Sequence, residues 1–356
     1  MSSNRYCVIM AGGIGSRFWP KSRQTMPKQF LDILGSGKSF IRHTFERFLG
    51  SVPQENFLVV TNRSYRDLVL EHLPELKPEQ VLCEPIGRNT APCICYAAFS
   101  LLKQNPDAEM IVTPADHYIS DEVAFRTIID EAVEFSSKNN SLMTIGVKPT
   151  RPETGYGYIQ VSSSDSISKV KCFTEKPNLE LAQTFVQCGE FFWNSGIFVW
   201  KVADIVKAIE SYMPDNYALF SSIMDSYGTE DEARAIAKVF AECKAISIDY
   251  GVMEQADNVY VRVGEFGWSD VGTWGSVYQH AKKDKYANSA SENTFFYDTR
   301  NSLVSLPEGK IAVVSGLRDY IIVDTKDVLM VCPREEEQNI KKYIDDVKYS
   351  KGEEFI

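Results

Sequence analysis

Short apolar runs alternate with longer segments of helical periodicity over about the first 150 residues. The apolar runs have the length of buried strands and comprise residues 6–11, 56–61, 109–113 and 141–147. The helical segments comprise residues 40–49, 65–73, 91–102 and 122–138. Strands that alternate with helices in this way predict parallel strands joined by right-handed crossovers. We therefore expect an α/β fold with a mixed, mainly parallel sheet and helices on both faces.

In sheets of this kind the ligand binds beyond the carboxyl ends of the strands. Three polar segments lie at such positions: the glycine-rich turn after residue 11, "ADH" at 115–117 and "RNT" at 88–90. We expect these three segments to share one rim of the sheet.

The pattern changes after about residue 150. Segments rich in glycine, aromatic and β-branched residues, such as "TGYGYIQV" and "NSGIFVW", extend the predicted sheet around a helical interval at 203–244. From about residue 291, short strand-like pieces precede an acidic helical tail, which predicts a small β-rich unit of parallel or solenoid type. The predicted domains are residues 1–285 and 286–356.

Composition indicates a globular protein with an uneven distribution of charge. The chain has 356 residues, 44% of them hydrophobic, enough for one large domain or one large and one small domain. The net charge of −10 argues against general binding to nucleic acids or anionic membranes. Residues 1–50 nevertheless hold eight Lys or Arg and two acidic residues, a net +6 that leaves −16 for the remainder. The opening segment therefore suits an anionic ligand.

The eight cysteines are scattered, and only Cys93 and Cys95 are close together. We expect reduced core thiols rather than zinc ligands. No apolar stretch approaches the ~18 residues of a membrane span, and the first apolar run is too short for a secretory signal. These features predict a cytoplasmic protein.

The stretch "MAGGIGSRFWPKSRQTMPKQF" at 10–30 follows the first predicted strand. Glycines at such a turn let backbone N–H groups approach a phosphate. The dinucleotide fingerprint G-x-G-x-x-G fails because Phe18 occupies the third glycine position, which disfavours an NAD-dependent dehydrogenase. The phosphate-loop motif fails as well, since Asp32 occupies its first glycine position before Gly37–Ser39.

What remains is a G-G-x-G-x-R pattern followed by a lysine. Arg17 offers a planar fork that suits paired phosphate oxygens, and Lys28 offers a compact point charge. Pro20 and Pro27 restrict the chain between them, which reduces the entropy lost when a ligand binds.

These residues resemble the sugar-1-phosphate nucleotidylyltransferase family, and within it the mannose-1-phosphate guanylyltransferases. The matching motifs are "AGGIGSRFWP", "PKQF", "EPIGRNTAP", "PADH", "PETGYGYI", "FTEKP", "FFWNSGIFVW", "SIDYGVME" and "GWSDVGTW". The resemblance implies a GT-A-like, Rossmann-like catalytic domain over 1–285 and a left-handed β-helix-like unit over 286–356. It also implies Mg²⁺-dependent transfer of GMP from GTP to mannose 1-phosphate, which forms GDP-mannose and pyrophosphate.

Two further expectations concern assembly and domain content. The family implies a homodimer, with the C-terminal β-rich unit as one candidate interface. Because the sequence ends at Ile356, we expect no separate phosphomannose isomerase domain of the kind that bifunctional relatives carry.

The resemblance assigns the phosphates and the metal to distant parts of the chain. Arg17 would bind the β- and γ-phosphates, and Lys28 the α-phosphate. Asp116 and Asp270 would hold Mg²⁺, which commonly combines few protein carboxylates with substrate oxygens. The alternative is that Asp116 caps a helix or Asp270 a turn.

The nucleotide side of the site would consist of Gly12, Gly13, Gly15, Glu84, Arg88, Asn89 and Thr90. The Glu84 carboxylate can accept hydrogen bonds from both N1–H and the exocyclic amine of guanine, a donor pair that the other bases lack. Asn89 or Thr90 could equally be the N-cap of the helix that follows.

The sugar-phosphate side would consist of Tyr156, Gly157, Glu175, Lys176, Asn194, Gly196 and Asp249. Glu175 would accept from sugar hydroxyls and Lys176 would face the phosphate, although an adjacent Glu and Lys alone would read as an exposed charged pair. Asp249 either orients sugar hydroxyls or supports Asp270, and the sequence does not choose between these roles.

Two alternatives stay open at this stage. One is a nucleotidylyltransferase for another nucleotide or another sugar 1-phosphate. The other is a non-catalytic GDP-sugar sensor, although the joint presence of reaction-centre residues such as Lys28 and Asp116 argues against it.

Overall fold

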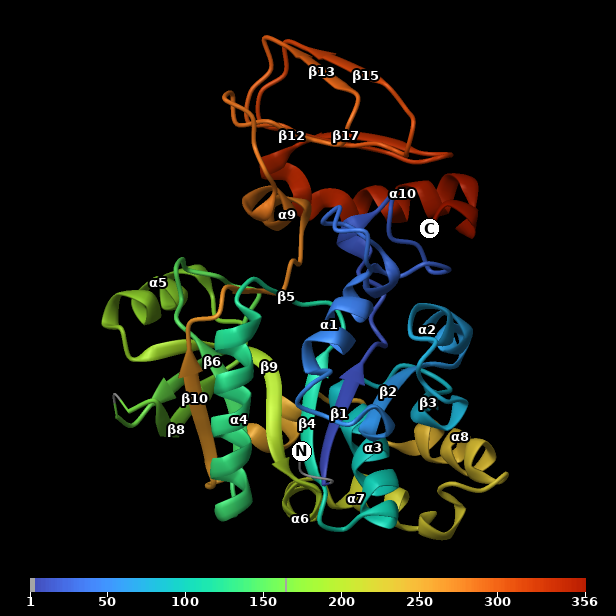
Figure 1. Ribbon diagram of the computed structural model, residues 1–356, viewed down its shortest axis with the longest axis vertical. Coiled ribbons are helices and arrows are strands. Elements are labelled where there is room, and N and C mark those ends of the chain that lie inside the picture. The colour runs from blue at the N-terminus through green and yellow to red at the C-terminus, as the bar shows by residue number, and fades with distance from the viewer. Residues whose placement is uncertain (1–3, 164) are drawn as a thin grey trace. The chain divides into compact units, whose positions relative to one another are not determined.

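The computed structural model describes residues 4–163 and 165–356, which divide into two compact units (Figure 1). Unit 1 comprises the described residues of Met1–Gly12, Thr44–Ala115 and Ile119–Trp268. Unit 2 comprises Gly13–His43, Asp116–Tyr118 and Ser269–Ile356. The glycine-rich segment and the "DHY" tripeptide thus belong to the same unit as the C-terminal part of the chain. The boundary at residues 285 and 286 stays a prediction.

Unit 1 is built on a nine-stranded sheet of order β3-β2-β1-β4-β9-β6-β10-β8-β7. The strands are β1 (Arg5–Met10), β2 (Phe57–Asn62), β3 (Val81–Glu84), β4 (Glu109–Pro114), β6 (Leu142–Val147), β7 (Tyr158–Val161), β8 (Ile167–Thr174), β9 (Phe191–Lys201) and β10 (Val259–Gly264). β3, β2, β1 and β4 are parallel, and so are β6 and β10. β9 is antiparallel to β4, β6 and β7. The predicted α/β class with a mixed sheet is confirmed.

Helices cover both faces of this sheet. Those of unit 1 are α2 (Arg66–His72), α3 (Thr90–Gln104), α4 (Glu122–Lys138), α5 (Leu179–Cys188), α6 (Val202–Tyr212), α7 (Pro214–Ser221) and α8 (Glu232–Glu242), and α1 (Phe40–Phe48) crosses from unit 2 into unit 1. Val8 of β1 belongs to the same buried cluster as the residues of α3 and α6. Its neighbour Cys7 is influenced electrostatically by Arg47 of α1. Since successive strand residues point to opposite faces, α1 and α3 lie on opposite sides of β1.

The cysteines follow the prediction of reduced thiols. All eight are free, and Cys93 and Cys95 are buried in α3 within the large hydrophobic cluster. Throughout residues 4–163 and 165–356, no helix combines the length and the apolar character that crossing a membrane would need.

The C-terminal part of unit 2 is a short coil of strands. It contains α9 (Trp274–His280), β12 (Ser289–Ala290), β13 (Thr294–Tyr297), β14 (Leu303–Ser305), β15 (Ala312–Ser315), β16 (Tyr320–Asp324), β17 (Leu329–Pro333) and α10 (Ile340–Lys351). In parallel register Thr294 pairs with Ala312 and Leu303 pairs with Ile321, each partner 18 residues further along the chain. A constant advance of this kind is the mark of a solenoid, and the predicted β-helix-like unit is confirmed.

The glycine-rich segment of unit 2 is anchored to the C-terminal end of the chain. Phe18 and Trp19 are buried in one cluster with Trp274 and with Ile340 of α10. The indole Nε1 of Trp19 donates to the carbonyl of Phe355 at 2.7 Å, and the ring of Phe18 meets that of Trp274 edge-on at 5.3 Å. The Trp19–Pro20 peptide bond is cis.

The last glycine of the G-G-x-G pattern is required by its contact with Lys28. Gly15 has a φ of +66°, and a Cβ built on it would overlap the Cβ of Lys28. The loop closes over the lysine through the Lys28 N–H, which donates to the carbonyl of Ile14 at 3.3 Å, and through Gln29, whose side chain donates to Gly13 at 2.9 Å. Gly15 therefore positions Lys28 and does not serve only the approach of a ligand.

We predict that Gly15→Ala lowers the free energy of unfolding by about 2–4 kcal/mol, because alanine is strained at positive φ and its methyl group displaces Lys28. Urea unfolding measures this change. Gly13→Ala is the matched control, since nothing lies within 4 Å of its added Cβ and its φ is not positive. Equal losses of stability in the two variants would contradict the packing role of Gly15.

Candidate active site

A polar cavity of about 270 Å³ in unit 2 collects residues from three separate segments of the chain. Its lining consists of Gly15, Ser16, Arg17, Phe18, Lys28, Asp116, His117, Asp270, Gly272 and Lys341. The four residues that the sequence assigned to phosphates and metal, namely Arg17, Lys28, Asp116 and Asp270, are thus brought together. We call this cavity the phosphate pocket.

Lys28 forms a buried cationic wall of the phosphate pocket. Its side chain is 4% exposed, and its Nζ lies 3.0 Å from Oδ2 of Asp116 and donates to the carbonyl of Asp270 at 2.7 Å. Its ammonium group also lies over the rings of Phe18 and Phe40, at 5.4 and 5.0 Å from their centroids. A buried charge is tolerated only with partners of this kind. The lysine therefore holds a positive charge at a fixed point of the pocket.

Asp116 and Asp270 present the two carboxylates of the phosphate pocket. Burial alone would raise the pKa of Asp116, but the charge and hydrogen bond of Lys28, together with His117, hold that pKa below its usual value. Asp116 is therefore ionised at neutral pH. Oδ1 of Asp270 accepts from the N–H of Gly272 at 3.0 Å, so this residue also caps its own turn, as the alternative interpretation of the sequence expected. The helix-cap alternative for Asp116 is wrong, because Asp121 is the residue that caps α4.

The donor set fits a metal ion that is shared with a ligand. Within the described chain, no group of three or more His, Cys, Asp or Glu side chains is arranged to enclose a metal. Two carboxylates on one polar cavity are what Mg²⁺ requires when phosphate and water oxygens complete its shell. Asp116 and Asp270 are the residues that could hold such an ion.

Glu84 is a buried acid with an unused acceptor. It ends β3, is 5% exposed, and its Oε1 has no hydrogen-bond partner among the described residues. A Cβ on Gly12 would lie 3.2 Å from its Oε2, so the glycine chain passes close to the carboxylate. Burial raises the pKa of Glu84 to about 7. An unpaired buried carboxylate is costly, and a ligand with two adjacent N–H donors would relieve that cost.

The "RNT" residues beside Glu84 have structural partners. Asn89 is the N-cap of α3, as the alternative interpretation expected, and its Oδ1 accepts from the N–H of Thr90 at 2.8 Å. The Thr90 hydroxyl accepts from the N–H of Ile248 at 2.9 Å. The guanidinium group of Arg88 donates to carbonyls at the end of α8, at 2.9 and 3.2 Å. Contacts of these three residues with a nucleotide stay predictions.

The predicted sugar-side residues form a connected network in unit 1. Nδ2 of Asn194 donates to Oδ1 of Asp249 at 2.8 Å, while its Oδ1 accepts from the N–H of Gly196 at 3.2 Å. Glu175 forms an ion pair with Lys176 at 2.6 Å. A Cβ on Gly157 would lie 2.5 Å from Oε2 of Glu175, so only glycine fits beside this carboxylate. The network fixes one amide and two carboxylates near one another.

Asp249 and Tyr156 complete the sugar side. Burial, reinforced by the charge of Glu175, raises the pKa of Asp249 to about 6. Its hydrogen bond to Asn194 favours the sugar-side role over support of Asp270. The backbone carbonyl of Tyr156 accepts from the N–H of Lys176 at 3.2 Å, which links the Tyr156–Gly157 turn to the same network.

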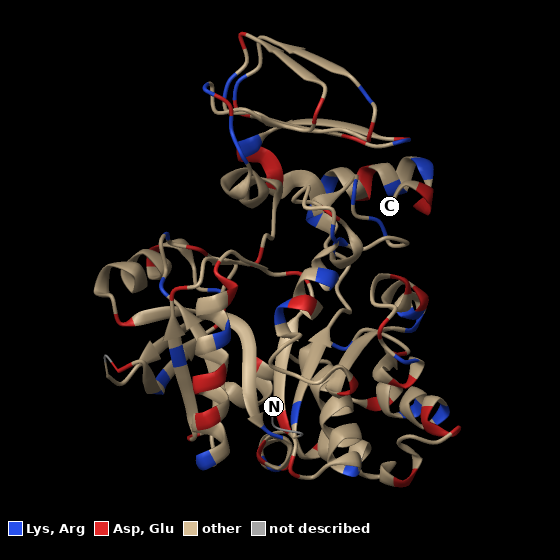
Figure 2. Cartoon of the chain, in the orientation of Figure 1, with Lys and Arg blue, Asp and Glu red and all other residues tan. Residues whose placement is uncertain are grey.

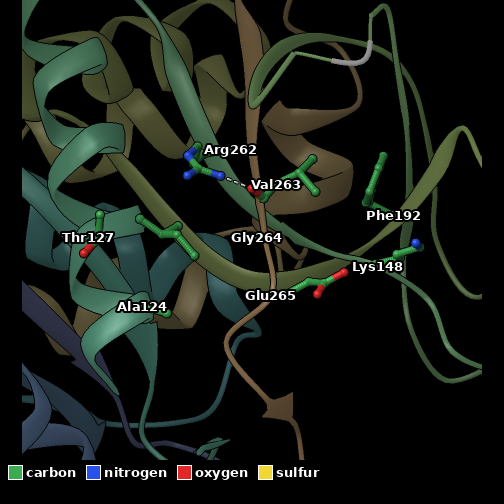
Figure 3. A pocket seen from close by; sticks show the side chains of 9 residues that line it. Ala124, Thr127, Lys148, Phe192, Arg262, Val263, Gly264 and Glu265 are labelled. Carbon is green, nitrogen blue, oxygen red and sulfur yellow. Dashed lines mark hydrogen bonds between the residues drawn. The ribbon is translucent and has the colours of Figure 1, made fainter. Parts of the chain in front are cut away.

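A second cavity, of about 500 Å³, lies in unit 1 between α4 and β10 (Figure 3). It is lined by Ala124, Thr127, Ile128, Lys148, Phe192, Arg262, Val263, Gly264 and Glu265. Arg262 is held by an ion pair with Glu131 at 2.7 Å and by a hydrogen bond to the carbonyl of Val263. None of the predicted site residues lines this cavity, so the phosphate pocket remains the candidate reaction centre.

Sequence reasoning missed one charged residue of the phosphate pocket. Lys341 lies in the acidic helical tail, where neither a motif nor a spacing sets it apart from its neighbours. Figure 2 shows basic and acidic residues intermingled along α10. Ser16 and Gly272 lie within recognised motifs and could have been named from their positions.

We predict that Glu84 makes the stability of the protein depend on pH. Burial raises its pKa from 4.5 to about 7, so between these values the folded protein binds more protons than the unfolded chain, and stability falls as the pH rises. Between about pH 5 and about pH 8 the wild-type protein should lose about 2–3 kcal/mol more than Glu84→Gln. Urea unfolding of both proteins at the two pH values measures the difference, and parallel losses would disprove it.

Comparison with known proteins supports the resemblance read from the motifs. A model of the family described as "Nucleotidyl transferase" matches residues 6–286, and one described as "MannoseP isomerase/GMP-like beta-helix domain" matches residues 292–347. A mannose-1-phosphate guanylyltransferase of Escherichia coli is 38% identical over 97% of this chain and 76% of its own length. One of Salmonella montevideo is 37% identical over 98% of this chain and 75% of its own length.

A solved structure agrees over almost the whole fold. It is a crystal structure from Thermus thermophilus, described as a "mannose-1-phosphate geranyltransferase". The two structures align with a TM-score of 0.88 and 28% identity, over 97% of this chain and 99% of the other. With a family model over most of its length and close relatives across nearly all of it, the chain belongs to the nucleotidyl transferase family, in the group of the mannose-1-phosphate guanylyltransferases.

Proposed function

We propose that this protein transfers GMP from GTP to α-D-mannose 1-phosphate, with GDP-mannose and pyrophosphate as products. The observation that carries the proposal is the phosphate pocket, in which Arg17, Lys28, Asp116 and Asp270 meet from distant segments. The relatives that bear the name of this activity support the choice of substrates.

The chemistry joins two anions. An oxygen of the sugar phosphate attacks the α-phosphorus of GTP, the bond between the α-phosphorus and its bridging oxygen to the β-phosphate breaks, and pyrophosphate leaves. A phosphate monoester is already ionised near neutral pH, so the reaction needs no strong general base. It needs positive charge and alignment instead. A buried lysine beside two carboxylates supplies these better than a catalytic triad would.

Each side chain of the phosphate pocket has a distinct role in this proposal. Lys28, buried and fixed, stabilises the charge that develops on the α-phosphate, and the exposed Arg17 binds the β- and γ-phosphates. Asp116 and Asp270 would hold Mg²⁺, which neutralises phosphate charge when bound. His117 supports the ionised state of Asp116.

The residues of unit 1 select the base and the sugar. The unpaired Oε1 of Glu84 supports its role as acceptor for guanine, and the Arg88–Thr90 segment supports the loop beside it. Glu175 and Asn194 bind sugar hydroxyls, with Asp249 orienting Asn194. Lys176 binds the sugar phosphate. Backbone amides of Gly157 and Gly196 contribute further donors, and Tyr156 carries the turn before Gly157.

Two broader features belong to the same proposal. A homodimer is supported by apolar side chains exposed on β13 and β15, among them Phe295 at 53% and Val313 at 67%, and the mass of the protein in solution tests it. A cytoplasmic location is supported by the eight free thiols, and fractionation of cells tests it.

We predict that GTP and mannose 1-phosphate form the best substrate pair. An assay of pyrophosphate release should cross GTP, ATP, UTP and dTTP with the 1-phosphates of mannose, glucose and galactose, with and without MgCl₂. Turnover should depend on the metal and be highest for the named pair. A different best pair would indicate a sister activity, and binding of GDP-mannose without any turnover would indicate a sensor.

We predict that Lys28→Met lowers kcat by about 10²–10³, because it removes a preorganised charge from the transition state. Methionine keeps the stem that packs on Phe18 and Phe40, and thermal unfolding checks that the fold persists. Lys38→Met is the control, since Lys38 is exposed in the same segment and lies outside the pocket lining. A kcat for Lys28→Met within about threefold of wild type would remove Lys28 from the reaction centre.

A further inference from the structure

The helix α10 of the C-terminal segment reaches the phosphate pocket. Lys341 in its first turn lines the cavity together with Arg17, and α10 packs against the turn Ser16–Phe18 that carries this arginine. All of these residues belong to unit 2. The β-helix-like unit therefore contributes a charged side chain to a pocket whose other charged residues come from nucleotidyltransferase motifs.

The position of Lys341 on α10 is set by its buried neighbours. Ile340 and Ile344, one turn apart, are buried in the cluster that contains Phe18 and Trp19. Lys341 directly follows the first of them, so it stands at the edge of the buried stripe, from which a long side chain reaches over the adjoining surface. The contact that buries the helix thus also directs its lysine towards the pocket.

The helix is held near both of its ends. Before its start, Oε2 of Glu337 accepts from the N–H of Gly275 at 2.6 Å. Beyond its end, the carbonyls of Phe355 and Ile356 accept from Trp19 Nε1 at 2.7 Å and from the N–H of Gln24 at 3.1 Å. Two anchors of this kind leave α10 little freedom to move away from the glycine-rich segment.

The charges of the phosphate pocket leave Lys341 available for a ligand. Lys28 is compensated by its ion pair with Asp116, and Asp270 is the other carboxylate of the lining. In the described parts of the chain no carboxylate forms an ion pair with Lys341, which is exposed. A lysine at a phosphate cavity, with no acid of its own, can serve as a point charge for a phosphate oxygen.

We propose that Lys341 binds the terminal phosphates of the polyphosphate chain, which are the γ-phosphate of the incoming nucleotide and the pyrophosphate of the reverse reaction. This inference rests on the proposed function for its nucleotide, but only on the pocket for its anion. Lys28 is buried and meets the reacting α-phosphate, whereas Arg17 and Lys341 are exposed and meet the distal phosphates. α10 is then a working part of the active site.

The kinetic test compares Lys341→Ala with Lys342→Ala, whose lysine is the exposed neighbour outside the pocket lining. Lys341→Ala should raise the KM for GTP and for pyrophosphate by about tenfold, the order expected for one charged hydrogen bond, with little change in the KM for mannose 1-phosphate. Lys341→Arg should recover most of the loss. The effect should shrink at high salt, because the contact is exposed.

The binding test does not depend on catalysis. Calorimetric titration with magnesium pyrophosphate should show about tenfold weaker binding for Lys341→Ala than for wild type or Lys342→Ala. If guanylyl transfer fails while this difference holds, the proposed function is wrong and the anion contact stands. If Lys341→Ala binds pyrophosphate as tightly as Lys342→Ala and wild type, Lys341 has no part in phosphate binding.

Discussion

The buried ion pair between Lys28 and Asp116 is the constraint on which the phosphate pocket depends. An ammonium group that is almost fully buried needs its partners at fixed distances, because neither water nor a flexible neighbour can replace them. Satisfying it draws together the glycine-rich segment, the "DHY" tripeptide and the backbone at Asp270. Gly15 belongs to the same constraint, since only a residue without a side chain can cross above the lysine stem.

The two units hold opposite chemistries. Unit 2 concentrates fixed positive charge and two carboxylates in one cavity, which suits phosphates and a hard cation. Unit 1 instead buries acids whose pKa values are raised, Glu84 and Asp249, and these suit neutral donors such as the N–H groups of a base or the hydroxyls of a sugar. The division follows the substrates themselves, whose phosphates are anionic and whose recognition groups are neutral.

Local patterns carried much of this structure and tertiary contacts carried the rest. The predicted helix 122–138 coincides with α4, because Asp121 supplies a cap and a regular apolar stripe follows it. The predicted cluster of Arg17, Lys28, Asp116 and Asp270 was accessible because each lies in a motif of recognisable form. Lys341 was not accessible, since its place depends on how α10 packs, and no local pattern records that packing. The contacts of Arg88 with the carbonyls of α8 are likewise formed across a long sequence separation.

The 18-residue advance of the C-terminal coil has a consequence for how this part of the chain can change length. A parallel coil in which every strand pairs with its equivalent one turn later can gain or lose chain only in whole turns, because a partial turn would place inward residues outward. The coil ends at α10, whose anchors lie on the glycine-rich segment. Changes in coil length are therefore quantised, and each must still return the chain to that segment.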